Sequence, residues 1–242
     1  MEFGHFSDVD IPVFQHDDLE EGLYTVNSSG YRCREFPTQG LEGKKNVVVL
    51  GCSHTFGIGS ADDELWVNLF EKKLDDKRLR FWNLGQPGAS PDLITRILYA
   101  TEKRLFPDII LICWPHTSRR ERLEKYPRNL TGADDLLKTE TDDTDEQNFL
   151  KNVFLVEKFA QHRSAKVFHC FAEQVQQLQS NYVYTDETLK NCWPAYDIAH
   201  LEDADRSLTK EPSMARDGVH YGVEHHERFS KQLYKAFRPK FR

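Results

Sequence analysis

The feature that most constrains the fold of this chain is an alternation of short apolar runs with helical patterns. The apolar runs lie at 46–50, 79–84, 108–113 and 166–171, and each is too short to be a helix. Apolar residues at helical spacing follow at 62–74, 91–98, 148–161 and 222–237. Because such runs are typical of parallel strands buried on both faces, the alternation predicts an α/β fold, a three-layer α/β/α sandwich around a mostly parallel sheet.

Two segments depart from this rhythm. Residues 23–26 and 31–36 flank the polar turn 27–30, a pattern that predicts a β-hairpin. We treat 1–44 as an N-terminal appendage and 45–242 as one globular domain. The stretch 131–147 is acidic and has almost no apolar periodicity, so we expect a solvated loop there.

Charge and cysteine usage narrow the class of protein. The net charge of −7 is concentrated in the acidic stretch, where seven acids and one lysine give −6, and no basic face for nucleic acid is evident. The five cysteines are an odd number without CxxC spacing, and no segment approaches the roughly 20 apolar residues of a membrane helix. We therefore expect a cytoplasmic protein without disulfides or membrane contact. We expect no cofactor, since the glycine motifs that bind nucleotides are missing. The oligomeric state stays open.

Chemically useful residues follow the predicted strands. Ser53 comes directly after the first run, Gly88 lies in the loop after the second, and Asp217 and His220 precede the last helical pattern. Ligands of parallel α/β sheets bind beyond the carboxyl ends of the strands, so one crevice could collect all of them. A serine hydroxyl needs a base to become nucleophilic; His220 would take its proton and Asp217 would orient the imidazole.

Several residues near Ser53 and His220 have further candidate roles. The backbone amides of Ser53 and Gly88 are candidate oxyanion donors. His54 is a competing base, although adjacent residues in an extended loop tend to point apart, and Cys52 is more easily explained as a small buried side chain than as a thiol nucleophile. His225 and His226 suggest a metal, but adjacent helical residues face different sides and are expected at the surface, so we expect no metal site.

Three of these segments resemble the motif blocks of the SGNH (GDSL-type) hydrolases. Gly51-Cys52-Ser53 resembles the block that carries the serine, the segment 83–88 resembles the block that supplies Gly88 as an oxyanion donor, and Asp217-Gly218-Val219-His220 matches the block that holds the other two triad members. The resemblance covers roughly 45–237. It implies a flavodoxin-like sheet and a serine esterase acting on small acyl esters, with carbohydrate O-acetyl groups as one candidate substrate.

The chain also departs from that family. Cys52 replaces the aspartate before the serine, and Trp114-Pro115-His116-Thr117 stands where the family has Gly-x-Asn-Asp. His116 aligns with the missing asparagine and would donate to the oxyanion through its ring N–H. Trp114 and Arg119 are candidate substrate-binding residues, with Arg119 suited to an anionic group. Two alternatives stay open: a noncatalytic module that binds glycan or protein, and an O-acyltransferase of the same fold.

Overall fold

A five-stranded parallel sheet lies at the centre of the computed structural model, which describes residues 23–37, 43–122, 128–130, 142–172, 192–194 and 213–240. The strand order is β2-β1-β3-β6-β7, and every neighbouring pair is parallel. The strands are β1 (Lys45–Gly51), β2 (Leu79–Asn83), β3 (Ile109–Trp114), β6 (Lys166–Phe171) and β7 (Cys192–Pro194). The first four are the four apolar runs of the sequence.

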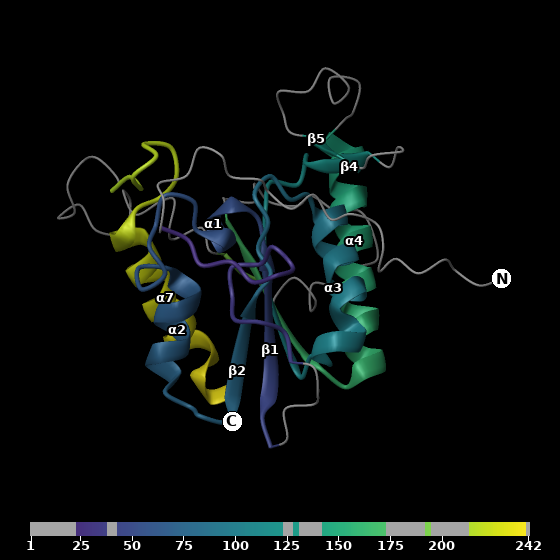
Figure 1. Ribbon diagram of the computed structural model, residues 1–242. Coiled ribbons are helices and arrows are strands. Elements are labelled where there is room, and N and C mark those ends of the chain that lie inside the picture. The colour runs from purple at the N-terminus through teal and green to yellow at the C-terminus, as the bar shows by residue number, and fades with distance from the viewer. Residues whose placement is uncertain are drawn as a thin grey trace.

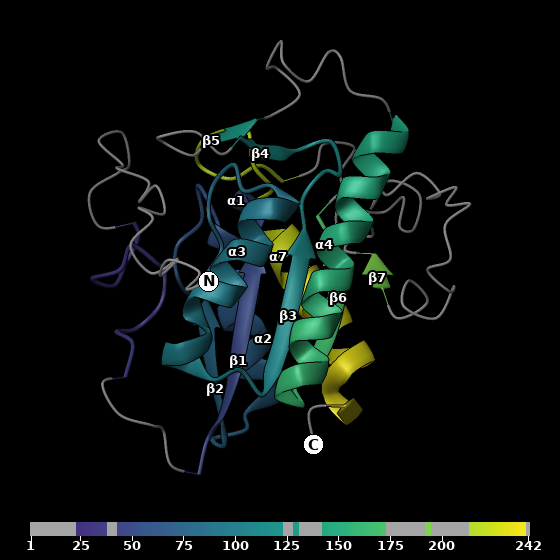
Figure 2. The same ribbon diagram turned by 90° about the vertical axis from the view of Figure 1, so that its right-hand side faces the viewer.

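Helices cover both faces of this sheet. Figure 1 shows α2 (Trp66–Leu74) and α7 (Val223–Phe237) on one side and α3 (Pro91–Leu105) and α4 (Asp142–Arg163) on the other. Figure 2 shows the second pair in front of β1 and β3. A short 3-10 helix, η4 (Arg238–Lys240), follows α7. The predicted three-layer α/β/α sandwich is therefore confirmed, and no helix in the described ranges is long and apolar enough to cross a bilayer.

The core lies on both sides of the central strands, as uninterrupted apolar runs require. Residues 47–50 of β1 and 110–112 of β3 are completely buried. In register, Val47 of β1 pairs with Phe81 of β2 on one side and with Ile109 of β3 on the other. This burial fixes the direction of β1 and with it the position of the residues that follow Gly51.

Two predicted helices begin elsewhere than expected. α2 begins at Trp66 rather than at residue 62, because Asp62 instead accepts bonds from Arg32 Nε and, through its backbone oxygen, from Asn68 Nδ2. α4 begins at Asp142, so the expected loop over 131–147 is wrong for 142–147, while 131–141 lies outside the described residues. Acidic residues suit the first turn of a helix, where they oppose the helix dipole, and Asp145 pairs with Arg120.

The N-terminal segment is not a hairpin in its described part, residues 23–37. No strand is formed there, although the turn at 27–30 is present. Asn27 Oδ1 accepts from the amides of Ser29 and Tyr31, at 3.0 Å each, and the Asn27 amide donates to the carbonyl of Tyr31 at 2.8 Å, so these bonds close the turn without a strand ladder beyond it. Tyr31 and Arg32 are buried instead, which packs this segment on the domain. The division at residue 44 stays a prediction.

Candidate active site

Ser53 lies where β1 gives way to the short helix α1 (Ser53–Phe56). The chain turns sharply at this point, and the carbonyl of Cys52 accepts from the amides of Thr55 and Phe56, at 2.9 Å each. A Cβ on Gly51 would lie 2.8 Å from the carbonyl oxygen of Cys113, so only glycine fits before the turn. Cys52 is a free, buried thiol, in agreement with its expected structural role. Ser53 itself is 6% exposed at the carboxyl end of the sheet.

Asp217 and His220 form a hydrogen-bonded pair on the loop before α7. His220 Nδ1 lies 2.5 Å from Asp217 Oδ2, and Asp217 Oδ1 accepts from the amides of Val219 and His220, at 3.1 and 3.0 Å. Partial burial raises the pKa of Asp217, but the bonds from the His220 side chain and the two amides outweigh it and hold that pKa below its usual value. The carboxylate is therefore ionised at neutral pH and fixes the direction of the imidazole, leaving Nε2 as the second ring nitrogen.

His54 links this pair to the serine turn. Its ring lies edge-on to the ring of His220, with centroids 5.4 Å apart, and stacks on Tyr221 at 4.9 Å. Burial, followed by the nearby charges of His220, His226 and Arg119, lowers the pKa of His54 to about 3. A neutral imidazole with so low a pKa is a poor proton acceptor, so His54 is better suited to supporting the site than to acting as its base.

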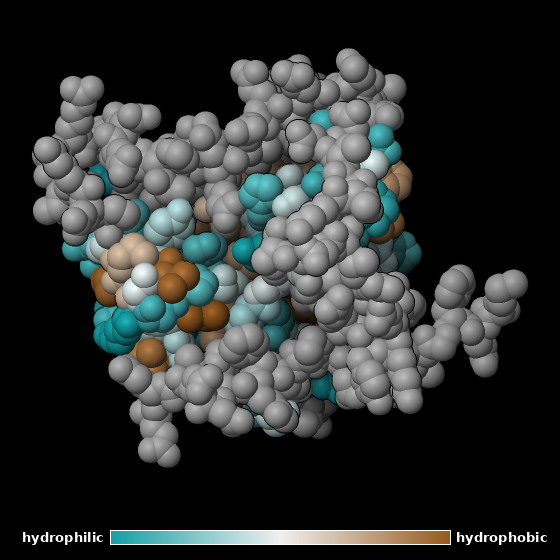
Figure 3. Space-filling view, turned by 90° about the horizontal axis from the view of Figure 1, so that it is seen from above, coloured by the Kyte–Doolittle hydropathy of each residue, from teal (hydrophilic) through white to brown (hydrophobic). Residues whose placement is uncertain are grey.

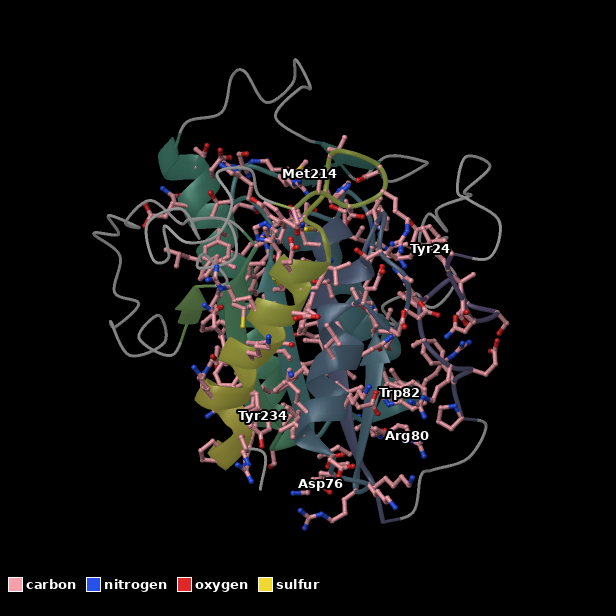
Figure 4. The ribbon with its side chains drawn as sticks, turned by 90° about the vertical axis from the view of Figure 1, so that its left-hand side faces the viewer. Tyr24, Asp76, Arg80, Trp82, Met214 and Tyr234 are labelled. Atoms are coloured by element: carbon pink, nitrogen blue, oxygen red, sulfur yellow. The ribbon has the colours of Figure 1, made fainter. Side chains whose placement is uncertain are left out.

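The loop of Asp217 is also held against the loop that follows α1. The amide of Arg216 donates to the carbonyl of Gly59 at 3.1 Å, and the guanidinium of Arg216 pairs with Glu64 at 2.5 Å. A Cβ on Gly59 would lie 2.7 Å from Ala215 Cβ, so the two loops touch where glycine permits it. These contacts bring residues more than 150 positions apart to one end of the sheet. Figure 4 shows the same loop, marked by Met214, at the end of the molecule opposite Asp76.

The loop after β2 packs on the serine turn from the other side. Asn83 Nδ2 donates to the carbonyl of Thr55 at 2.8 Å, and the amide of Gln86 donates to the carbonyl of Gly51 at 3.0 Å. Gly88 follows in a left-handed conformation, with φ of 72°, and an added Cβ there would meet nothing within 4 Å. This backbone is open to an approaching ligand, a property that suits the predicted oxyanion donor.

His116 is exposed and takes part in a turn after β3. Its Nδ1 accepts from the amide of Ser118 at 3.2 Å and lies 2.7 Å from the Ser118 hydroxyl. Because Nδ1 is an acceptor in this arrangement, the ring proton belongs on Nε2, which is then a potential donor. The structure thus gives His116 a chemically suitable tautomer, while its role toward an oxyanion stays a prediction.

Trp114 does not lie on the surface of the crevice, and its prediction as a substrate-binding residue is wrong. Its side chain is completely buried. The indole Nε1 donates to His169 Nδ1 at 2.9 Å, and His169 Nε2 lies 2.9 Å from Glu157 Oε1. β3 extends to Trp114, one residue beyond the predicted strand, and the indole packs between the rings of His169 and Phe149, with centroids 5.9 and 5.4 Å away.

The prediction of a surface position is also wrong for His225 and His226, which are both buried. His226 Nδ1 accepts from the amide of Trp66 at 3.3 Å, and the ring of His225 lies 4.8 Å from that of Tyr221. Burial, with the charges of Arg32 and His225, lowers the pKa of His226 to about 4. Within the described ranges, no three potential ligands among His, Cys, Asp and Glu gather closely enough to hold a metal ion.

Sequence reasoning missed Arg32, which holds the loop behind Ser53. Its guanidinium donates to the carbonyls of Phe56, Gly57 and Ser60 at 2.9, 2.6 and 2.6 Å, and to Asp62 Oδ1 at 2.7 Å. The arginine side chain is 1% exposed. The loop that lacks the family's aspartate is therefore held by a cation from the N-terminal segment, a contact that no local sequence pattern signals.

Figure 3 looks down on this end of the molecule, where described residues of hydrophilic and hydrophobic character lie side by side. Backbone hydrogen bonds join three segments at the carboxyl end of the sheet, since Gly51 before the serine turn accepts from Gln86, and Gly59 after α1 accepts from Arg216. The described contacts thus place the Asp217–His220 pair beside His54, the residue next to Ser53, whereas Trp114 is buried in the core. A triad of Ser53, Asp217 and His220 stays a prediction.

Comparisons with known proteins match the architecture rather than the sequence. No protein-family model matches the chain, and no curated protein matches it. Among solved structures, TesA aligns with a TM-score of 0.53 at 16% identity, over 81% of this chain and 99% of TesA. The psychrotrophic esterase EstA from Pseudoalteromonas sp., in a structure inhibited by monoethylphosphonate, aligns with a TM-score of 0.52 at 16% identity, over 82% and 99%.

A member of the lipolytic protein G-D-S-L family from Veillonella parvula gives a TM-score of 0.52 at 15% identity, over 80% of this chain and 98% of that one. Each alignment spans most of both chains, so the likeness concerns the whole sandwich and not one βαβ unit. At identities of 15–16%, these structural alignments show a shared fold and do not show a shared activity. The chain therefore has the fold of the SGNH (GDSL-type) hydrolases and is a divergent member of that fold.

Proposed function

We propose that this protein is a serine esterase that hydrolyses small acyl esters through an acyl-enzyme intermediate on Ser53. The observation that carries the proposal is the Asp217–His220 pair. Its 2.5 Å bond is reinforced by two backbone amides, and its imidazole contacts the ring of His54, the residue next to Ser53. An ionised carboxylate on Nδ1 of a histidine beside a serine turn is the arrangement that nucleophilic catalysis requires.

In the proposed reaction, Ser53 Oγ attacks the ester carbonyl while His220 Nε2 takes the hydroxyl proton. Asp217 stabilises the imidazolium that forms. Collapse of the tetrahedral intermediate breaks the ester bond, and His220 returns the proton to the leaving alcohol. Water then attacks the acyl-enzyme with His220 again acting as the base, which releases the acid and restores Ser53.

Three donors are proposed for the oxyanion: the amides of Ser53 and Gly88 and Nε2–H of His116. The open backbone at Gly88 and the acceptor role of His116 Nδ1 support this assignment. One such donor is worth about 3 kcal/mol of activation free energy in enzymes where it has been removed. The exposed His116 would then take the place of the family's asparagine.

The proposal is tested by covalent labelling of Ser53 and by measuring the hydrolysis of an ester substrate. EstA is inhibited by monoethylphosphonate, and we expect a fluorophosphonate probe to modify Ser53 here, as mapped by mass spectrometry of the labelled peptide. Ser53→Ala and His220→Ala should abolish both labelling and hydrolysis of 4-nitrophenyl acetate. His162→Ala, which removes an exposed histidine from the last turn of α4, is the matched control and should behave like the wild type.

Labelling that persists unchanged in the folded Ser53→Ala protein would contradict the proposal. A folded wild type that neither reacts with the probe nor turns over short or long acyl esters would instead favour the noncatalytic binding module. Hydrolysis and acyl transfer are separated by adding a glycan acceptor and measuring whether it takes the acyl group in place of water.

A further inference from the structure

The two adjacent arginines after β3 differ in their partners. Arg120 Nη2 lies 3.0 Å from Asp145 Oδ1 and forms an ion pair with it. The neighbouring Glu121 is occupied too, since Arg96 donates to both of its carboxylate oxygens, at 2.5 and 3.1 Å. Asp145 and Glu121 are therefore each occupied by another cation, and neither of them pairs with Arg119.

Arg119 has a buried donor without a partner. Its Nη1 is shielded from solvent and forms no hydrogen bond, while its backbone amide donates to the carbonyl of His116 at 3.2 Å. A buried polar atom without a partner costs free energy, and more so when the group is charged. A ligand with a negative charge would remove that cost, so this donor is prepared for an anion that the chain itself does not supply.

The position of Arg119 connects it with the candidate active site. Its charge is among those that lower the pKa of His54, together with the charges of His220 and His226. Asp217, the acid of the site, is already engaged by the His220 ring and by the amides of Val219 and His220. Arg119 also follows β3, which pairs with β1, so it belongs to the same carboxyl end of the sheet as Ser53.

We propose that Arg119 binds a carboxylate of the substrate, so that the preferred substrates are esters that carry one negative charge close to the scissile bond. This inference rests on the proposed esterase function. A guanidinium matches the two oxygens of a carboxylate through parallel N–H bonds. A phosphomonoester carries close to two charges at neutral pH, and one unpaired guanidinium matches a single carboxylate better because Arg120 is already neutralised by Asp145.

The test compares matched pairs of neutral and anionic esters. In the first pair, mono-4-nitrophenyl glutarate carries the charge on the acyl side, and its methyl ester is the neutral partner. In the second pair, 3-acetoxybenzoate carries the charge on the alcohol side, and its methyl ester is the neutral partner. For at least one pair, wild-type kcat/KM should be about ten- to hundredfold higher for the anion, the range expected for a hydrogen-bonded charge. R119M should lose this preference, R119K should keep part of it, and the control R120M should retain it.

The neutral esters distinguish this inference from the proposed function. The control R120M should hydrolyse them within about twofold of the wild-type rate, and the loss of kcat/KM in R119M should be at least about tenfold larger for the anionic ester than for its neutral partner. An equal loss on both members of a pair would assign Arg119 to the oxyanion or to the structure and overturn the inference, as would a wild type without any preference for the anion. If no ester is hydrolysed, glutarate binding followed by NMR decides: binding that weakens at least about tenfold in R119M supports the inference, and no binding refutes it.

Discussion

Arg32 offers the sharpest test of how the serine loop is held. The replacement Arg32→Met keeps an unbranched side chain and removes the guanidinium that donates to three loop carbonyls and to Asp62. Burial lowers the pKa of Arg32, and the bonds and charge of Asp62 act in the opposite direction. We therefore expect the loss of one partner from a buried ionic network.

The expected loss of free energy of unfolding in Arg32→Met depends on how exposed its partner Asp62 is. Removing one partner of a buried pair costs about 3–5 kcal/mol. The Asp62 side chain is 42% exposed and can return to water, which places the expected loss at the lower end, at about 3 kcal/mol of the free energy of unfolding. For a chain of this size the melting temperature falls by roughly 2–4 °C per kcal/mol, so Arg32→Met should lower it by roughly 6–12 °C.

The assay is thermal unfolding with a surface pair as the control. Arg78 and Asp76 approach to 2.6 Å, but the Arg78 side chain is 71% exposed and the pair lies at the opposite end of the molecule from the serine turn (Figure 4). Arg78→Met should leave the melting temperature unchanged within error. Equal melting temperatures for the two variants would refute the burial reasoning.

A second readout addresses the serine itself. The rate of fluorophosphonate labelling of Ser53 should fall in Arg32→Met at temperatures where the protein is fully folded, because the loop behind the nucleophile loses its anchor. An unchanged labelling rate would mean that Arg32 contributes to stability and not to the placement of Ser53.

Three further predictions concern the site. Asp217→Asn should reduce kcat by about 10³- to 10⁴-fold with little change in KM, and a loss below tenfold would exclude Asp217 from the triad. Gly85→Ala should unfold at a markedly lower temperature than Gly88→Ala. The Cβ at residue 85 would lie 2.5 Å from the amide nitrogen of Phe56, whereas the Cβ at residue 88 would add only the strain of a left-handed φ of 72°; the reverse order would contradict the packing. Burial lowers the pKa of His54 from 6.5 to about 3, so the folded state resists protonation of this group. Its contribution to the free energy of unfolding is therefore fully present above pH 6.5 and decreases by roughly 1 kcal/mol per pH unit as the pH drops from 6.5 toward 3. His54→Phe should make this fall shallower and leave the contribution of His226, as followed by melting temperature against pH; an identical slope would show that His54 is not buried and neutral.

The sequence by itself determined the sheet and the ends of its strands. Residues 47–50 are apolar at every position, a pattern typical of a strand buried on both faces, and the helical spacing between such runs predicts the sandwich. Once β1 was placed, Ser53 had to follow it at the carboxyl edge, and Gly88 had to follow β2 at the same edge. These conclusions depend on local periodicity and on the geometry of parallel sheets, both of which are written in short stretches of sequence.

Only the tertiary structure decided which side chains meet. Trp114 is buried because its indole packs against His169 of β6 and Phe149 of α4. Arg120 forms an ion pair with Asp145, whereas Nη1 of the adjacent Arg119 is buried without a hydrogen-bond partner. Arg32 reaches carbonyls 24 to 28 residues further along the chain. Such partners are chosen by burial and distance in three dimensions, and no spacing in the sequence encodes them.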